Sequence, residues 1–338
     1  VTLEEYKRRL TGRRTILEEV RALPDQALDQ AMAKTHHEAQ REGPVLLSLA
    51  ADNQKFVVER AGTVRFQPTT KPAADWFASA GELRPEFGGG KSGALRRTLD
   101  GDWLPIPVIT KEHQGVQLSQ RSFVAPLVEL NRCLDFGDHP CVAVLEFTLT
   151  NTLDRATETA LNLRTLSNTK QKTPAQLQSS GQSWRWQQDG HDFGFATVVE
   201  SPLQLTTDGP GVLSWKGTLP AHAGTTLTVF LSQLAMDFAA LPKLSELRAR
   251  TEAYWNAMIK RALDVTTPDP LLNNAIRSSQ VRCLIDARNE AEGHRVAAWI
   301  AAVSYGPLES ESHSVIRGMD FMGHGEFAER ALEFFVHR

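Results

Sequence analysis

Residues 143–165, AVLEFTLTNTLDRATETALNLRT, decide the fold class of this 338-residue chain. Apolar side chains recur at every second position from Ala143 to Leu149 and again from Leu161 onward. This period of two is typical of strands with one buried face, because successive side chains of a strand point to opposite sides. Asp154-Arg155 separates the two runs, so the segment predicts a β-hairpin in an antiparallel sheet.

Further strand patterns extend from this segment in both directions. Toward the N-terminus they begin with VLLSLAADNQKFVVERAGTVRF at residues 45–66. Residues 65–102, rich in Pro, Gly and charge, predict a long excursion or a loop between strands. Toward the C-terminus, the strands 184–186 and 193–199 flank an Asp-Gly turn, and 226–231 form the last clear strand. We therefore predict a large antiparallel β-sandwich over residues 43–240.

Helical patterns lie on both sides of this sandwich. Residues 1–42 predict two N-terminal helices, and from Pro242 the apolar period changes to three and four, which predicts a linker helix over 241–266. Within 267–338, Asp269-Pro270 begins one helix, and two more form an antiparallel hairpin around Gly323-His324-Gly325. The helical pattern is still running at Arg338, so we expect a fragment of a longer polypeptide.

Three phrases of the sequence resemble the six-hairpin glycosidase-like superfamily. They are EAYWNAMI at 252–259, VTTPDPLLNNAIRSSQ at 265–280 and YGPLESESHSVIRGMDFMGHGEFAERALEFF at 305–335, preceded by the β-rich region. The resemblance implies multidomain β + α architecture: a β-supersandwich, a linker helix and the first hairpins of an (α/α)6 toroid, apparently truncated. It also implies a carbohydrate-active enzyme whose catalytic acid lies in later hairpins, so the catalytic residues of this chain are unknown.

The resemblance also implies where the sugar is contacted. In the family, a Tyr followed by an Arg-Asp or Glu pair touches the sugar before an early toroid helix, and here Tyr305 and Glu309-Ser310-Glu311 stand in that place. Glu-Ser-Glu replaces the commoner Arg-Asp. His313 and Arg317 follow one helical turn apart and are able to hydrogen-bond a substrate. The candidate substrate-binding residues are therefore Tyr305, Glu309, Glu311, His313 and Arg317.

The same residues also have structural explanations. Acidic side chains at a helix start complement its dipole, and Glu311, His313, Arg317 and Asp320 are spaced to form surface pairs. Tyr305 is also suited to closing a loop over the core. Glycoside hydrolysis needs two carboxyl groups across the scissile bond, and at a helix start Glu309 and Glu311 diverge. The sequence leaves both explanations open.

Composition narrows the classes of partner. Lys and Arg total 37 against 40 for Asp and Glu, without long runs of one sign, so nucleic acid and anionic membranes are not expected partners. No recognised metal spacing occurs, and we expect neither metal nor cofactor.

Cys133 and Cys141 flank a turn-rich segment and are either bridged or two buried thiols. Localisation stays undetermined, with periplasmic or secreted slightly favoured over cytoplasmic.

These observations lead to three hypotheses for the function. The first, whose reaction type is implied by the resemblance, is a glycan-degrading enzyme, an inverting glycoside hydrolase acting on oligo- or polysaccharide if the chain is part of a longer one. The second is a polysaccharide lyase, which the balanced charge disfavours because lyases need basic residues for polyanions. The third is a non-catalytic glycan-binding or assembly module. Either a homo-oligomer or the continuation of the same polypeptide is expected to cover the open toroid.

Overall fold

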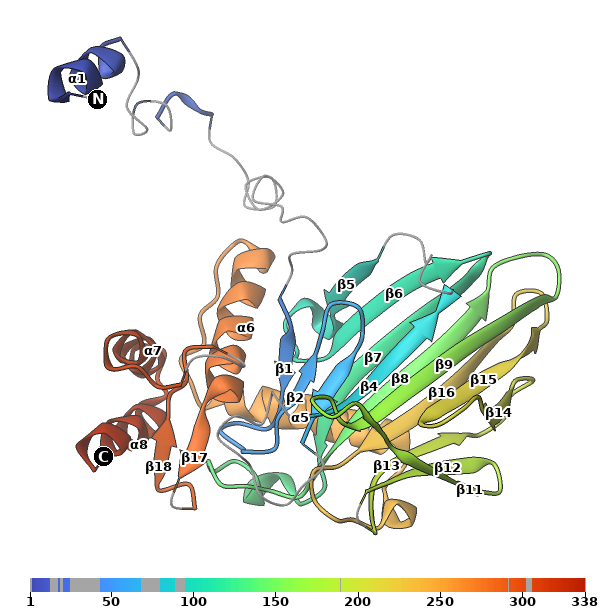
Figure 1. Ribbon diagram of the computed structural model, residues 1–338. Helices are drawn as coiled ribbons and strands as arrows, with labels where there is room; N and C mark the ends of the chain where they lie inside the picture. Colours follow the sequence, from blue (N-terminus) through green and yellow to red (C-terminus); the bar gives the residue numbers. More distant parts are fainter. Residues whose placement is uncertain are drawn as a thin grey trace.

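The computed structural model describes residues 2–12, 18, 21–24, 43–67, 80–88, 95–188, 190–290, 292–301 and 306–337. Within these residues a large body of antiparallel strands lies beside a group of helices from the C-terminal quarter (Figure 1). Near the N-terminus, α1 (Leu3–Leu10) begins with a Thr2 capping box and buries none of its residues. The predicted second N-terminal helix, from Asp25 to Gly43, lies almost entirely outside the described residues.

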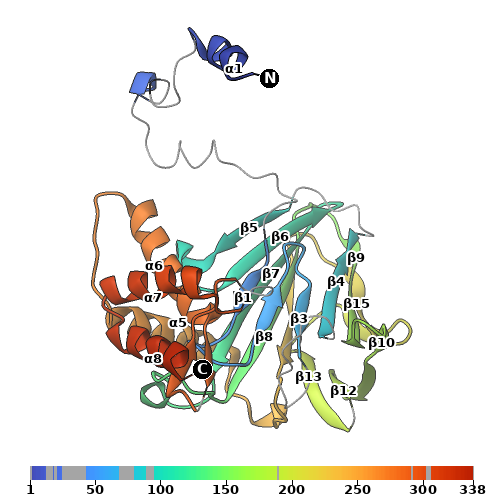
Figure 2. The same ribbon diagram turned by 60° about the vertical axis from the view of Figure 1, so that its left-hand side comes forward.

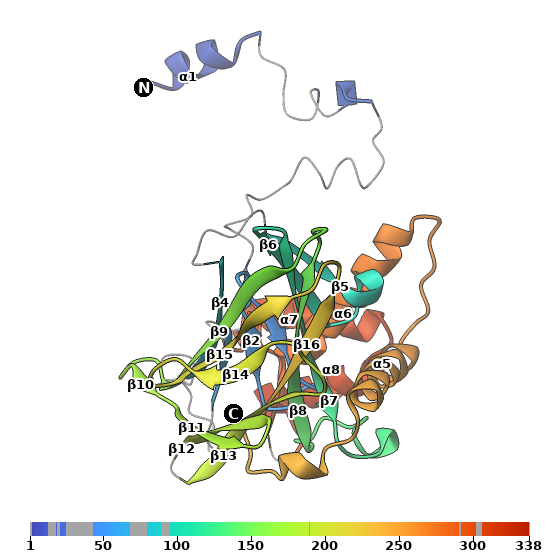
Figure 3. The same ribbon diagram turned by 90° about the vertical axis from the view of Figure 1, so that its right-hand side faces the viewer.

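The strands form two eight-stranded sheets that lie face to face (Figure 3). The first sheet has the order β1 (Val45–Leu47), β2 (Phe56–Val58), β3 (Val64–Phe66), β4 (Gly81–Phe87), β9 (Thr157–Asn168), β15 (Val212–Leu219), β14 (Gln204–Thr207), with β10 (Thr173–Pro174) also pairing with β9. The second sheet has the order β11 (Gln176–Ser180), β12 (Ser183–Gln188), β13 (His191–Val198), β16 (Gly224–Leu231), β8 (Cys141–Asn151), β7 (Val116–Pro126), β6 (Pro107–His113), β5 (Arg96–Leu99).

Alternate residues of both sheets build the core. Leu161 and Trp215 of the first sheet are neighbours across β9 and β15, and Phe147 and Leu227 of the second are neighbours across β8 and β16. All four side chains are fully buried. The predicted large antiparallel sandwich is therefore present.

The predicted hairpin between residues 143–150 and 159–165 is wrong. β8 pairs with β7 and β16 in the second sheet, whereas β9 pairs with β4 and β15 in the first. The five residues between them carry the chain from one sheet to the other. Asn151 holds this crossover, because its Nδ2 donates to the carbonyl oxygens of Arg155, Leu219 and Pro220 at 2.8, 3.1 and 3.0 Å.

The predicted loop over residues 65–102 is also partly wrong. Although 68–79 and 89–94 lie outside the described residues, β4 and β5 fall inside this range. β4 is a central strand with Leu83 and Phe87 buried, and Pro85 stands opposite Leu163 of β9. A proline argues against a central strand because it cannot donate to the ladder, which is why the sequence pattern concealed this one.

Other expectations agree with the structure. β12 and β13 form the predicted hairpin, and β16 is the predicted last strand of the sandwich. Cys133 and Cys141 are both buried and free, which is the second of the two alternatives for them. No helix among the described residues is long and apolar enough to cross a bilayer.

Four helices gather at one side of the sandwich (Figure 2). The linker helix α5 (Leu244–Lys260) lies along β7, where the Thr251 hydroxyl donates to the Val124 carbonyl at 3.3 Å. α6 (Pro270–Asp286) begins at the Asp269 cap as predicted, and the small hairpin of β17 (Arg288–Glu290) and β18 (Arg295–Ala297) follows it. α7 (Glu309–Phe321) and α8 (Gly325–Val336) then pack together, which confirms the predicted helical hairpin. That these helices begin a toroid stays a prediction.

Candidate functional site

The first turn of α7 presents the two glutamates of the sequence motif. The helix begins after Leu308, whose side chain offers no cap, and Glu309 and Glu311 complement the positive end of the helix dipole. The buried Ser312 hydroxyl donates to the Ala298 carbonyl at 2.7 Å and ties this turn to the end of β18. Glu309 and Glu311 are both exposed to solvent at this turn.

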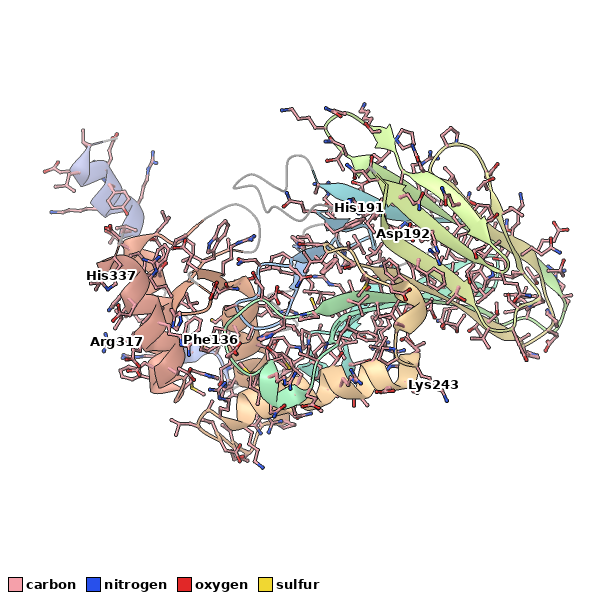
Figure 4. The ribbon with its side chains drawn as sticks, turned by 90° about the horizontal axis from the view of Figure 1, so that it is seen from below. Phe136, His191, Asp192, Lys243, Arg317 and His337 are labelled. Atoms are coloured by element: carbon pink, nitrogen blue, oxygen red, sulfur yellow. The ribbon has the colours of Figure 1, made fainter. Side chains whose placement is uncertain are left out.

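Among the candidate residues that the structure describes, no hydrogen bond or ion pair joins Glu309, Glu311, His313 and Arg317 to one another. The Ser310 hydroxyl donates to the Glu311 carboxylate, and across the described ranges neither glutamate has a basic partner within 4 Å. His313 is exposed, and so is Arg317, which Figure 4 labels on α7. The guanidinium carbon of Arg317 lies 5.1 Å from the Phe321 ring centre, and the expected ion pairs of Arg317 with its helix neighbours are not formed. Tyr305 lies outside the described residues. Substrate contact by these side chains stays a prediction.

Arg288 and Trp299, which precede α7 in the sequence, form a cation–π pair that the sequence analysis did not identify. The guanidinium carbon of Arg288 sits 4.5 Å from the centre of the half-buried Trp299 ring, and Trp299 follows the Ala298 carbonyl that anchors α7. Burial lowers the pKa of Arg288 to about 10, so this side chain stays charged at neutral pH. A half-buried indole is able to pack on the apolar face of a sugar ring, and exposed carboxylates accept protons from sugar hydroxyls.

A polar cluster that is buried except for one exposed aspartate, Asp138, connects this region to the sandwich. We call it the polar junction and define it as Asp52, Lys55, Asp138 and Asn289. Lys55 is fully buried, and its ammonium donates to the Ala287 carbonyl at 2.8 Å, to the Ile285 carbonyl and to the Ser48 hydroxyl at 3.3 Å. Desolvation, and next to it the nearby Arg288, lowers the pKa of Lys55 to about 7. The lysine thereby joins the first strands of the sandwich to the end of α6.

Asp52 and Asp138, the two acidic residues of the polar junction, connect it to the segment just before β8. Asp52 accepts backbone hydrogen bonds from Gln54 at 2.7 Å and from His139 at 2.9 Å, and burial together with the neighbouring Asp138 raises the pKa of Asp52 to about 6. Asp138 in turn accepts from Nδ2 of Asn289, the middle residue of β17, at 2.7 Å. Since Asp52, Lys55 and Asn289 are buried, they hold the hairpin in place and do not touch a ligand.

The sequence offered little signal for the junction. Lys55 and Ala287 are 232 residues apart, and Asp138 and Asn289 are 151 apart. Each residue is unremarkable in its own segment, and only the three-dimensional fold brings them together. The one local signal is a lysine next to the buried strand β2, Phe56–Val58.

Comparisons with known proteins give only distant likenesses. No protein-family model matches the chain, and no curated protein matches it. A structure titled as a putative kojibiose phosphorylase from human microbiome has a TM-score of 0.34 and 12% identity, over 70% of this chain and 38% of that one. The family GH92 alpha-mannosidase from Bacteroides thetaiotaomicron has a TM-score of 0.26 and 10% identity over the same shares. The chain thus spans 38% of the length of each, at TM-scores too low to establish a shared fold.

Proposed function

We propose that this chain is the sandwich and leading helical part of a glycan-degrading enzyme, an inverting glycoside hydrolase that contacts its sugar at the start of α7. The observation that carries the proposal is the pair of exposed glutamates, Glu309 and Glu311, which have no basic partner among the described residues. Carboxylates left without a counter-charge on a rigid turn are available to accept hydrogen bonds from sugar hydroxyls. The order of sandwich, linker helix and helical hairpin supports the same proposal.

Hydrogen bonds also hold the α7 turn in place, which favours glycan binding. Ser312 fixes the α7 turn to the Ala298 carbonyl, and the polar junction fixes the hairpin that ends there. A preorganised site loses less entropy when it binds, so more of the hydrogen-bond energy appears as affinity. None of the described carboxylates is assigned the role of general acid, which hydrolysis also requires.

The test is product analysis after incubation of the full-length protein with panels of neutral and acidic oligosaccharides. The proposal predicts new reducing ends from neutral substrates, with inverted anomeric configuration in the first minutes of an NMR time course. An unsaturated product that absorbs in the ultraviolet would identify a lyase and reject the hydrolase. Saturable glycan binding without turnover would reject it in favour of a binding module.

A further inference from the structure

A cleft lies away from the first turn of α7, where the sandwich meets the helices. Its volume is about 440 Å³, and it is lined by Trp103 from the connection between β5 and β6, by the end of α5 and the segment after it, and by α6. Ligand sites favour such meeting points of domains, and they have volumes of about 300 to 1,000 Å³. The polar residues that line this cleft are Asn256, Lys260, Asp264, Arg277 and Gln280.

The charges of the cleft favour an anion. The cleft is lined by two basic side chains, Lys260 and Arg277, and by one acidic side chain, Asp264. Arg277 is half-buried. In the part of the chain that the structure describes, neither Arg277 nor Lys260 has an ion-pair or hydrogen-bond partner for its side chain, and Asp264 lies beyond 4 Å of both. A guanidinium that is partly desolvated without a counter-charge is costly, and a carboxylate or phosphate matches its planar fork with two parallel hydrogen bonds.

The remaining lining is suited to a ring with hydroxyl groups. Trp103 is half-buried, and Ile259 and Ile276 add apolar surface beside it. Gln280 is fixed at both ends of its amide, because Nε2 donates to the Ile276 carbonyl at 3.3 Å and Oε1 accepts from His324 Nε2 at 2.9 Å. Burial, and next to it Arg261, lowers the pKa of His324 to about 4, so the imidazole is neutral at pH 7 and its Nε2–H is the donor.

We propose that this cleft binds a saccharide unit that carries one anionic group, with Arg277 and Lys260 on the anion and Trp103 against the sugar ring. Asn256 donates its Nδ2 to the Glu252 carbonyl at 2.8 Å, which leaves its Oδ1, together with the Asp264 carboxylate, to accept from sugar hydroxyls. The anion is a carboxylate, as in a uronic acid, or a phosphate ester. This inference does not rest on the proposed function, because it uses none of the residues at the start of α7.

The experiment is calorimetric titration of the full-length protein with glucuronic acid, glucose 6-phosphate, inorganic phosphate and glucose. The proposal predicts saturable binding of at least one of the two acidic sugars, weaker binding of inorganic phosphate, which lacks the ring, and of glucose, which lacks the charge. Binding should weaken with added salt, since half-exposed charges are screened. The two acidic sugars distinguish a carboxylate ligand from a phosphate ester.

Variants of the lining residues test whether the acidic sugar binds in this cleft. Arg277→Gln should weaken the acidic sugar about tenfold to hundredfold, because a charge-assisted hydrogen bond is lost. Arg155→Gln, at an exposed arginine on the crossover between β8 and β9, is the matched control and should bind like wild type. Trp103→Phe keeps an apolar ring, so a milder loss is expected and a thermal melt checks its fold. The proposal is overturned if neither acidic sugar binds, or if Arg277→Gln binds as tightly as the control.

Discussion

Lys55 is the residue on which the connection of the sandwich to α6 depends most directly. Its ammonium is fully buried, and two of its acceptors are backbone carbonyls at and just past the end of α6. Such carbonyls have no partner within a helix, and a lysine beside them also complements the negative end of the helix dipole. The burial that places the charge there also opposes it, which is why the pKa of Lys55 falls from 10.5 to about 7.

This lowered pKa predicts a pH dependence of the free energy of unfolding. Between pH 7 and 10.5 the unfolded chain holds the Lys55 proton and the folded chain has lost it, so the unfolded state binds more protons and stability rises with pH. In Lys55→Met that rise should be absent. Urea unfolding of both proteins at intervals from pH 7 to 10 measures it, with the exposed Lys170→Met as the control. If the free energy of unfolding changed with pH in the same way in wild type and in Lys55→Met, the lowered pKa of Lys55 would be contradicted.

The raised pKa of Asp52 predicts that, at lower pH, the free energy of unfolding changes with pH in the opposite direction. Its pKa is raised from 3.8 to about 6, so between these values the folded state binds more protons and stability falls as pH rises. In Asp52→Asn, whose amide keeps one acceptor for the backbone donors, this fall should be smaller. Urea unfolding from pH 4 to 6.5 tests the difference, and an unchanged slope in the variant would show that Asp52 is ionised throughout that range.

At the scale of elements, α6 depends on its first turn. The Asp269 carboxylate accepts from the backbone N–H groups of Leu271 and Leu272 at 2.8 and 3.4 Å, and Pro270 occupies the first helical position. Asp269→Ala should lower the free energy of unfolding by about 1 kcal/mol, whereas Asp269→Asn should retain most of it because asparagine caps equally well. Urea unfolding of the two variants tests this, and equal losses would mean that the charge matters more than the cap.

The elements also show what a sequence pattern predicts well and what it does not. α5 and α6 were predictable because their apolar spacing and the Asp269-Pro270 start are local properties of the sequence. The pairing of β8 and β9 was not, because alternation shows that a strand has a buried face without showing which strand lies beside it. Asn151, whose side chain holds the crossover, has no local pattern that distinguishes it from an ordinary turn residue.

At the scale of the whole molecule, three regions have different roles. The polar junction unites sandwich and helices, the α7 turn exposes two glutamates, and the cleft beside Trp103 and Arg277 lies where the sandwich meets α5 and α6. The sequence motif indicated the first helical turn of α7, since its residues are contiguous. Trp103 and Arg277 are 174 positions apart in the printed sequence, so only the fold identifies their cleft.

The most direct test of the account is the kcat/KM of Glu309→Gln and Glu311→Gln on whichever neutral oligosaccharide the full-length protein cleaves. Glu329→Gln, an exposed glutamate on α8, is the matched control. The account predicts that at least one of the two variants at the start of α7 loses about tenfold or more, as expected for a lost charge-assisted hydrogen bond, while the control is unchanged. Wild-type kcat/KM in both, with normal folding, would contradict a sugar site at this turn.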